Sequence, residues 1–89
     1  MKLVKVSEAI EIVSAATGKP QQRRVAILQR DDGYFSFAEE YSYTSEYEGR
    51  VIAEGWQQFP SEGIFESAEL AEVAGQSALL QRHKHKERR

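Results

Sequence analysis

The most constraining feature of this sequence is the turn signal Asp31-Asp32-Gly33, which separates two runs with the two-residue period of β-strands. Residues 25–30 place apolar side chains on both faces, whereas residues 34–44 place aromatic rings on one face and small or polar side chains on the other. An Asp-Gly step supplies the positive φ that a tight hairpin needs. This segment therefore predicts an antiparallel hairpin at the centre of the fold.

Further strands and a helix are predicted after the hairpin. Residues 45–50 are polar and contain a glycine, so they predict a second turn, followed by a third strand over residues 51–59 and a short fourth strand over residues 63–65. Ser67 is a candidate N-cap for a helix that runs from Ala68 to about Arg82. Gly75 lies inside this helix, where glycine costs about 1 kcal/mol relative to alanine, so we infer close packing there.

The apolar stripe of this helix predicts which residues meet in the core. Leu70, Val73 and Ala74 recur at helical spacing and are expected to face the sheet. The expected cluster consists of Phe35 or Phe37, Ile27, Trp56, Leu70, Val73 and Ala74. Among the acidic residues, Glu39 alone falls on the aromatic face of its strand. Either a bulge redirects it, or it lies where that face reaches solvent.

Between Ser7 and Gly18 the sequence predicts a second helix of about three turns, and residues 1–6 are expected to be a short strand or a loose arm. The apolar stripe of this second helix consists of Ala9, Ile10, Ile12, Val13 and Ala16. Ser7 precedes it as a candidate N-cap, and Gly18 and Pro20 follow as stop signals. The competing interpretation is a strand, because Val4 and Val6, and then Ile10 and Ile12, also alternate.

The order of elements predicts an α+β fold in two layers, in which an antiparallel meander of three to four strands packs against an N-terminal and a C-terminal helix. The 89 residues suit one domain, expected over residues 1–82, with a basic flexible tail over residues 83–89.

Residues 24–78 resemble a group of small, mostly uncharacterised proteobacterial proteins. The residues that carry the resemblance are Gly33-Tyr34-Phe35-Ser36-Phe37, Gly55-Trp56 and Gly63-Ile64-Phe65-Glu66-Ser67-Ala68-Glu69. The resemblance implies a bacterial, cytosolic origin and a small α+β fold. It supplies no catalytic residue.

Catalytic and metal chemistry find little support in the sequence. There is no cysteine, and both histidines, His83 and His85, fall in the expected tail, so we expect no metal site and no cofactor. Glu39 and Glu40 are adjacent in a strand and point to opposite faces, so they do not form an acid–base pair. No apolar run is long enough to span a membrane. We expect a cytoplasmic protein that is not an enzyme.

Two kinds of partner are considered. Residues 82–89 hold five basic residues against one glutamate, which permits a module that binds nucleic acid through its tail. Residues 31–72 hold eleven acidic residues against one arginine, and such a surface repels phosphate.

A protein partner is therefore the first hypothesis. The aromatic rings exceed what one helix-covered face can bury, and tyrosine and tryptophan dominate protein-binding hot spots. The expected partner-binding residues are Tyr34, Tyr41, Tyr43, Tyr47, Trp56 and Glu39. We expect a bacterial regulator, inhibitor or immunity-type protein that binds a protein through an aromatic, acidic sheet face. A symmetric homodimer through this sheet is also expected.

Overall fold

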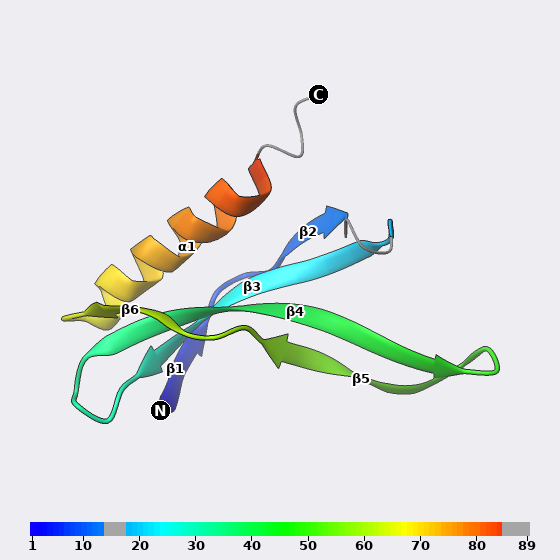
Figure 1. Ribbon diagram of the computed structural model, residues 1–89, viewed down its shortest axis with the longest axis horizontal. Helices are drawn as coiled ribbons and strands as arrows, with labels where there is room; N and C mark the ends of the chain where they lie inside the picture. Colours follow the sequence, from blue (N-terminus) through cyan, green and yellow to red (C-terminus); the bar gives the residue numbers. More distant parts are fainter. Residues whose placement is uncertain (14–17, 85–89) are drawn as a thin grey trace.

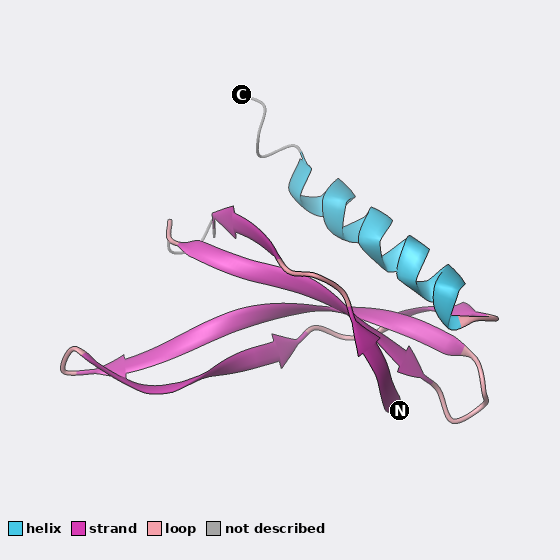
Figure 2. Ribbon diagram, turned by 180° about the vertical axis from the view of Figure 1, so that it is seen from behind, coloured by secondary structure: helices cyan, strands magenta, loops and turns pink. Residues whose placement is uncertain are grey.

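The chain folds into one curled antiparallel sheet with a single helix on one side, as the computed structural model shows for residues 1–13 and 18–84 (Figures 1 and 2). The elements in chain order are β1 (Lys2–Val6), β2 (Ile10–Val13), β3 (Pro20–Gln29), β4 (Phe35–Tyr47), β5 (Arg50–Gln58), β6 (Glu62–Phe65) and α1 (Ala68–Lys84). The predicted strands of the central hairpin, the third and fourth strands and the C-terminal helix are therefore all present.

The sheet is built around the long central strands β3 and β4. The outer edge of β3 pairs with β1 and β2 in turn, and the outer edge of β4 pairs with β5 and β6. Ser7 bridges the gap between β1 and β2, because its backbone N–H donates to the carbonyl of Val25 at 2.8 Å and its Oγ accepts from the N–H of Val25 at 3.0 Å. On the other edge, the N–H of Phe59 donates to the carbonyl of Glu39 at 2.9 Å.

The predicted fold, a meander of three to four strands packed against an N-terminal and a C-terminal helix, is wrong, because the sheet has six strands and the described residues form one helix. In place of the N-terminal helix, residues 10–13 form β2, where Ile10 and Ile12 are half-buried while Glu11 and Val13 are exposed, which is the period of a strand. Residues 1–6, expected as a short strand or a loose arm, contain β1. β-Branched side chains fit this pleated surface well. Ser7, the predicted N-cap, joins two strands. Residues 14–17, which include part of the predicted helix, lie outside the described residues.

The turn end of the β4–β5 hairpin, made of the C-terminal half of β4 and the N-terminal half of β5, projects beyond β3. We call residues 42–56 the ribbon, because over this length β4 pairs with β5 alone (Figure 1). Glu48 and Gly49 have φ values of 53° and 79°, the left-handed pair that matches the twist of a two-residue hairpin turn. A Cβ at Gly55 would lie 3.1 Å from the hydroxyl oxygen of Tyr43, so the tyrosine ring covers the glycine across the ribbon.

The helix packs on the sheet through its small residues. Its predicted cap is confirmed, because Ser67 Oγ accepts from the N–H of Leu70 at 3.1 Å. A Cβ at Gly75 would lie 2.6 Å from Val25 Cγ1 and 3.0 Å from Phe37 Cγ, so the helix backbone lies directly against the sheet. The buried cluster consists of Val25, Ile27, Phe37, Ala71 and Leu79, with Ile10, Phe35, Phe65, Ala68, Ala74 and Ala78 around it.

The predicted core is therefore partly wrong. Ile27, Phe37 and Ala74 meet as expected, but Leu70 and Val73 are 52% and 67% exposed because the helix turns its alanines and its glycine toward the sheet. Trp56 lies on the opposite face of the sheet, level with Ser42. The sheet has one helix on one face and no helix of the described residues on the other (Figure 2). On that other face Ala26, Leu28 and Ala38 form a second, smaller buried cluster.

The helix also continues further than predicted. His83 and Lys84 belong to α1, so the expected tail does not begin at His83, and residues 85–89 lie outside the described residues. Within the described part of the chain, no helix has the length and apolar character needed to cross a membrane.

Candidate functional site

Glu39 is the most deeply buried charged residue of the described chain, with 4% of its surface exposed. Side chains alternate along β4, so Phe37, Glu39 and Tyr41 all face the side of the sheet that carries the helix. Glu39 stays in regular register opposite Val25. It is therefore neither redirected by a bulge nor placed where this face reaches solvent, as the sequence had suggested.

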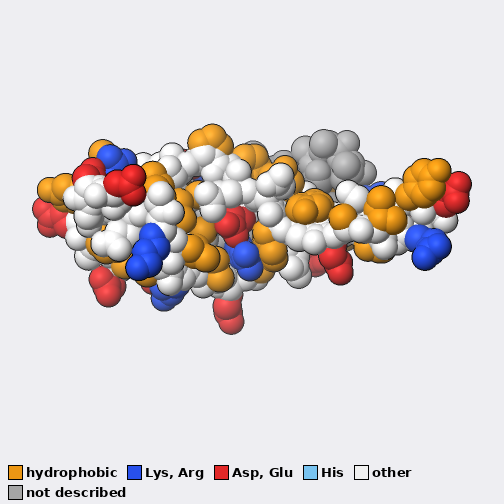
Figure 3. Space-filling model, turned by 90° about the horizontal axis from the view of Figure 1, so that it is seen from below, with side chains coloured by type: hydrophobic (Ala, Val, Ile, Leu, Met, Phe, Trp, Pro, Cys, Tyr) orange, Lys and Arg blue, Asp and Glu red, His pale blue; other side chains and the backbone are white. Residues whose placement is uncertain are grey.

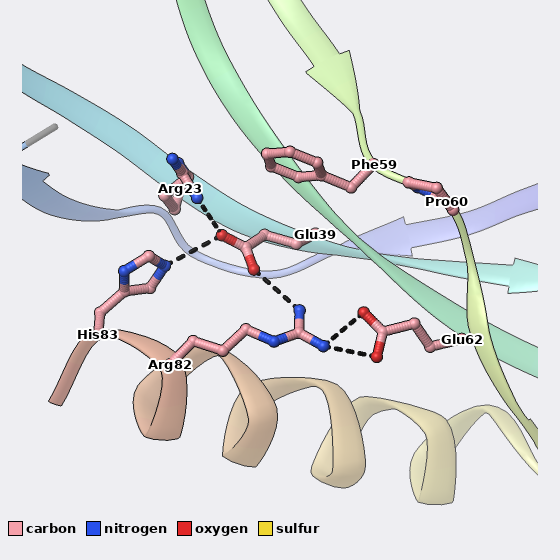
Figure 4. A pocket seen from close by; sticks show the side chains of 7 residues that line it. All are labelled: Arg23, Glu39, Phe59, Pro60, Glu62, Arg82 and His83. Atoms are coloured by element: carbon pink, nitrogen blue, oxygen red, sulfur yellow. Dashed lines mark hydrogen bonds and ion pairs between the residues drawn. The ribbon is translucent and has the colours of Figure 1, made fainter. Parts of the chain in front are cut away.

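Three side chains from two other elements converge on this carboxylate (Figure 4). Arg23 of β3 and His83 of α1 contact Glu39 Oε2, the histidine through Nε2 at 3.0 Å. Arg82 of α1 donates to Glu39 Oε1 at 3.0 Å. The same guanidinium also binds both carboxylate oxygens of Glu62 in β6, at 2.5 and 2.6 Å. These residues, Arg23, Glu39, Glu62, Arg82 and His83, are called the Glu39 cluster below.

The cluster keeps Glu39 ionised. Burial alone raises the pKa of this carboxyl group, but hydrogen bonds from His83, Arg23 and Arg82 together outweigh burial and lower the pKa below its ordinary value of 4.5. The pKa of Arg82 is raised by its hydrogen bonds to Glu62 and Glu39. Because an ionised carboxylate only accepts hydrogen bonds, His83 Nε2 carries the proton that it donates to Glu39.

A pocket of about 480 Å³ opens beside the cluster, at the end of α1. Its lining consists of the Glu39 cluster with Phe59 and Pro60 from the segment between β5 and β6 (Figure 4). Arg23 also stacks over aromatic rings, with its guanidinium carbon 5.3 Å from the ring centre of Phe59 and 5.8 Å from that of Tyr41. His83 Nδ1 is buried and has no hydrogen-bond partner among the described residues.

The geometry of the cluster suits a structural role, in which it holds the end of α1 to the sheet, better than proton transfer. Both oxygens of Glu39 already accept hydrogen bonds, and its lowered pKa makes it a weak base. Arg82 joins Glu39 on β4 to Glu62 on β6, so one side chain ties the helix end to two strands. Among the described residues, no group of three or more histidine or acidic side chains is arranged to hold a metal ion. His85, the other histidine of the predicted tail, lies outside them.

A second network occupies the opposite face of the sheet. Arg24 Nε donates to Glu40 at 2.7 Å, and its guanidinium carbon lies 4.0 Å above the ring centre of Trp56. Gln58 Nε2 donates to the other oxygen of Glu40 at 2.9 Å. Glu39 and Glu40 therefore point to opposite faces, as predicted, and each has its own arginine.

The six residues predicted to bind a partner do not share one face. Tyr41 packs on Phe59 with ring centres 5.0 Å apart, beside the Glu39 cluster. Trp56 lies on the opposite face, and Tyr34 is exposed at the far end of β4. Tyr43 and Tyr47 lie in the ribbon strand of β4, and Trp56 lies at the base of the ribbon in β5. The arrangement brings Tyr41 near Glu39 and separates the other four residues from them.

The ribbon exposes apolar side chains among acidic ones. Tyr47, Val51 and Ile52 are each more than half exposed. Glu46, Glu48 and Glu54 accompany them against the single Arg50. Figure 3 shows hydrophobic side chains at the end of the molecule that holds the ribbon, with acidic and basic groups beside them, and further hydrophobic side chains over the rest of this face.

Sequence reasoning singled out Glu39 but missed its partners. The signal was that Glu39 is a charged residue on the aromatic face of its strand. Arg82 and His83 lie 43 and 44 residues away, and their stretch of sequence suggested a fraying helix end, so no local signal connected them to Glu39.

No protein-family model, curated protein or solved structure matches this chain. The resemblance to small proteobacterial proteins therefore stays a prediction.

Proposed function

We propose that this chain is a small, non-enzymatic cytoplasmic protein that binds another protein through the ribbon. The observation that supports the proposal is the exposure of Tyr47, Val51 and Ile52 on a two-stranded ribbon that no other described element covers. Isolated two-stranded ribbons are marginally stable in water, and exposed aromatic and aliphatic side chains of this kind mark interaction sites. A partner that packs on the ribbon would supply the missing layer.

The charges of the ribbon favour a basic protein over a nucleic acid. Glu46, Glu48 and Glu54 form no ion pair with any described residue, so they are free to attract cationic side chains. The same charges repel phosphate. Arg82, the first residue of the basic C-terminal segment, is already paired with Glu39 and Glu62, which weakens the case for a nucleic-acid tail.

Cross-linking from single positions tests the proposal. A photoreactive amino acid at Ile52 is expected to capture one basic protein in the native host, whereas the same group at the exposed Tyr34, at the other end of β4, is not. The captured protein, once purified, should bind the chain in titration calorimetry. Replacing Glu46, Glu48 and Glu54 by lysine should weaken that binding. Equal capture from both positions, or binding unchanged by charge reversal, would contradict the proposal.

A further inference from the structure

The outer side of α1 carries large apolar residues that face no part of the described chain. Leu70, Val73 and Leu80 are 52%, 67% and 59% exposed, and Ser77 is exposed between them. They lie on the side of the helix opposite Ala71 and Gly75, which are buried against the sheet. The helix thus presents its small side chains to the sheet and its large ones outward.

The spacing of these residues matches the seam of a packed helix pair. Positions 70, 73, 77 and 80 follow one another at intervals of three, four and three residues, which are the intervals of the apolar positions of a coiled coil. Such a seam on one face allows the side chains of one helix to fit between those of another.

The seam is complementary to itself when two copies of the helix run antiparallel. A two-fold axis on the outer side of the helix, at the level of residue 75 along its length, would place Leu70 opposite Leu80 of the second copy, and Val73 opposite Ser77 of the second copy. The helix dipoles agree with this direction, because the N-terminus of each helix would lie beside the C-terminus of the other.

We propose that two copies of this chain associate through α1 in an antiparallel, two-fold symmetric pair with Leu70, Val73, Ser77 and Leu80 at its centre. The interface is separate from the ribbon and differs from the sheet-mediated dimer expected from the sequence. A helix of 17 residues is about 25 Å long, which is short for an interface of standard size, so the pair is expected to form at micromolar rather than nanomolar concentration.

Engineered cysteines test the register, because the chain contains no cysteine of its own. Leu70→Cys mixed with Leu80→Cys should form a mixed disulfide under mild oxidation. Neither variant alone should cross-link to itself, because equivalent residues would lie about 15 Å apart along the axis, beyond the reach of a disulfide. Ile52→Cys on the ribbon is the matched control. Self-linking of Leu70→Cys, or no mixed product above the level of the control, would overturn the proposal.

Sedimentation tests the affinity. The wild-type chain should change from a 10.1 kDa monomer to a dimer as its concentration rises through the micromolar range. Leu70→Gln with Leu80→Gln should raise the dissociation constant at least about tenfold, since each leucine loses an apolar contact. Circular dichroism should stay unchanged because both side chains are exposed. Ile52→Gln should leave the dimer intact. A wild-type monomer at high concentration, or dissociation caused by the ribbon variant alone, would refute the helix pair and leave the proposed ribbon function standing.

Discussion

Gly75→Ala tests the close approach of the helix to the sheet, because two effects of opposite sign act at this position. Alanine stabilises a helix interior by about 1 kcal/mol relative to glycine. However, the new Cβ would lie 2.6 Å from Val25 Cγ1 and 3.1 Å from Phe37 Cβ. Val25 is buried and stiff at χ1, so it cannot turn away, and overpacking of this kind costs about 1–3 kcal/mol. The clash should win, with a net destabilisation of about 1 kcal/mol.

Thermal unfolding measures this effect. In a domain of this size about 1 kcal/mol lowers the melting temperature by about 4–8 °C. The matched control compares alanine with glycine at the exposed neighbour Gln76, where no sheet residue interferes and alanine should be the more stable by about 1 kcal/mol. The sign of the Ala–Gly difference should therefore reverse between positions 75 and 76. If alanine stabilised both positions, the helix would not lie against the sheet as described.

Three further outcomes are expected from the packing and the Glu39 cluster. Leu79→Ala should lower the free energy of unfolding by about 2–5 kcal/mol because Leu79 is buried. Leu70→Ala should change the stability of the monomer by less than about 0.5 kcal/mol because Leu70 is exposed. Denaturant unfolding of both variants at low protein concentration measures the two effects. Glu39→Gln should cost about 3 kcal/mol, because it leaves the largely buried Arg23 without its counter-charge, and Glu54→Gln on the exposed ribbon is the control. Folding lowers the pKa of Glu39, so the contribution of its carboxylate to the free energy of unfolding is present above the pKa of the unfolded chain and is lost as the pH falls through the folded pKa. The difference in stability between the wild type and Glu39→Gln should therefore shrink below about pH 4.5, and urea unfolding at several pH values measures it.

The strands and the C-terminal helix were predictable because each carries a local signal. The Asp-Gly turn at Gly33 and the cap at Ser67 act through their own neighbours, and both behave as the sequence indicates. In the N-terminal segment the local signals, Ser7 as a cap and Gly18 and Pro20 as stops, favoured a helix and were misleading. Ile10 and Ile12 suit a strand as well as one helix face, and the pairing of Ile10 with Arg23 of β3 decided between them.

The face of the helix was not predictable from hydrophobicity. Leu70 and Val73 form the more apolar stripe, yet the sheet accepts the side that holds Ala71 and Gly75, because the close approach to Val25 leaves room only for small side chains. The Glu39 cluster was equally hidden. Burial of one carboxylate calls for cationic partners, but which arginine would reach it depends on where a helix 43 residues later ends.

The helix turns its small side chains toward the sheet, so the protein buries few large hydrophobic side chains. Among the described residues, five large hydrophobic side chains are buried, whereas fifteen are exposed. Each buried one contributes about 1.5–3 kcal/mol, a small sum against the conformational entropy of a domain of this length. The ion pairs of the Glu39 cluster fasten the helix end but add little apolar burial. Seven of the fifteen exposed side chains lie on the outer side of α1 or on the ribbon, which are the two surfaces that the proposals assign to partners. Association through either surface would bury apolar area that the isolated chain leaves in water, and would stabilise the fold by mass action.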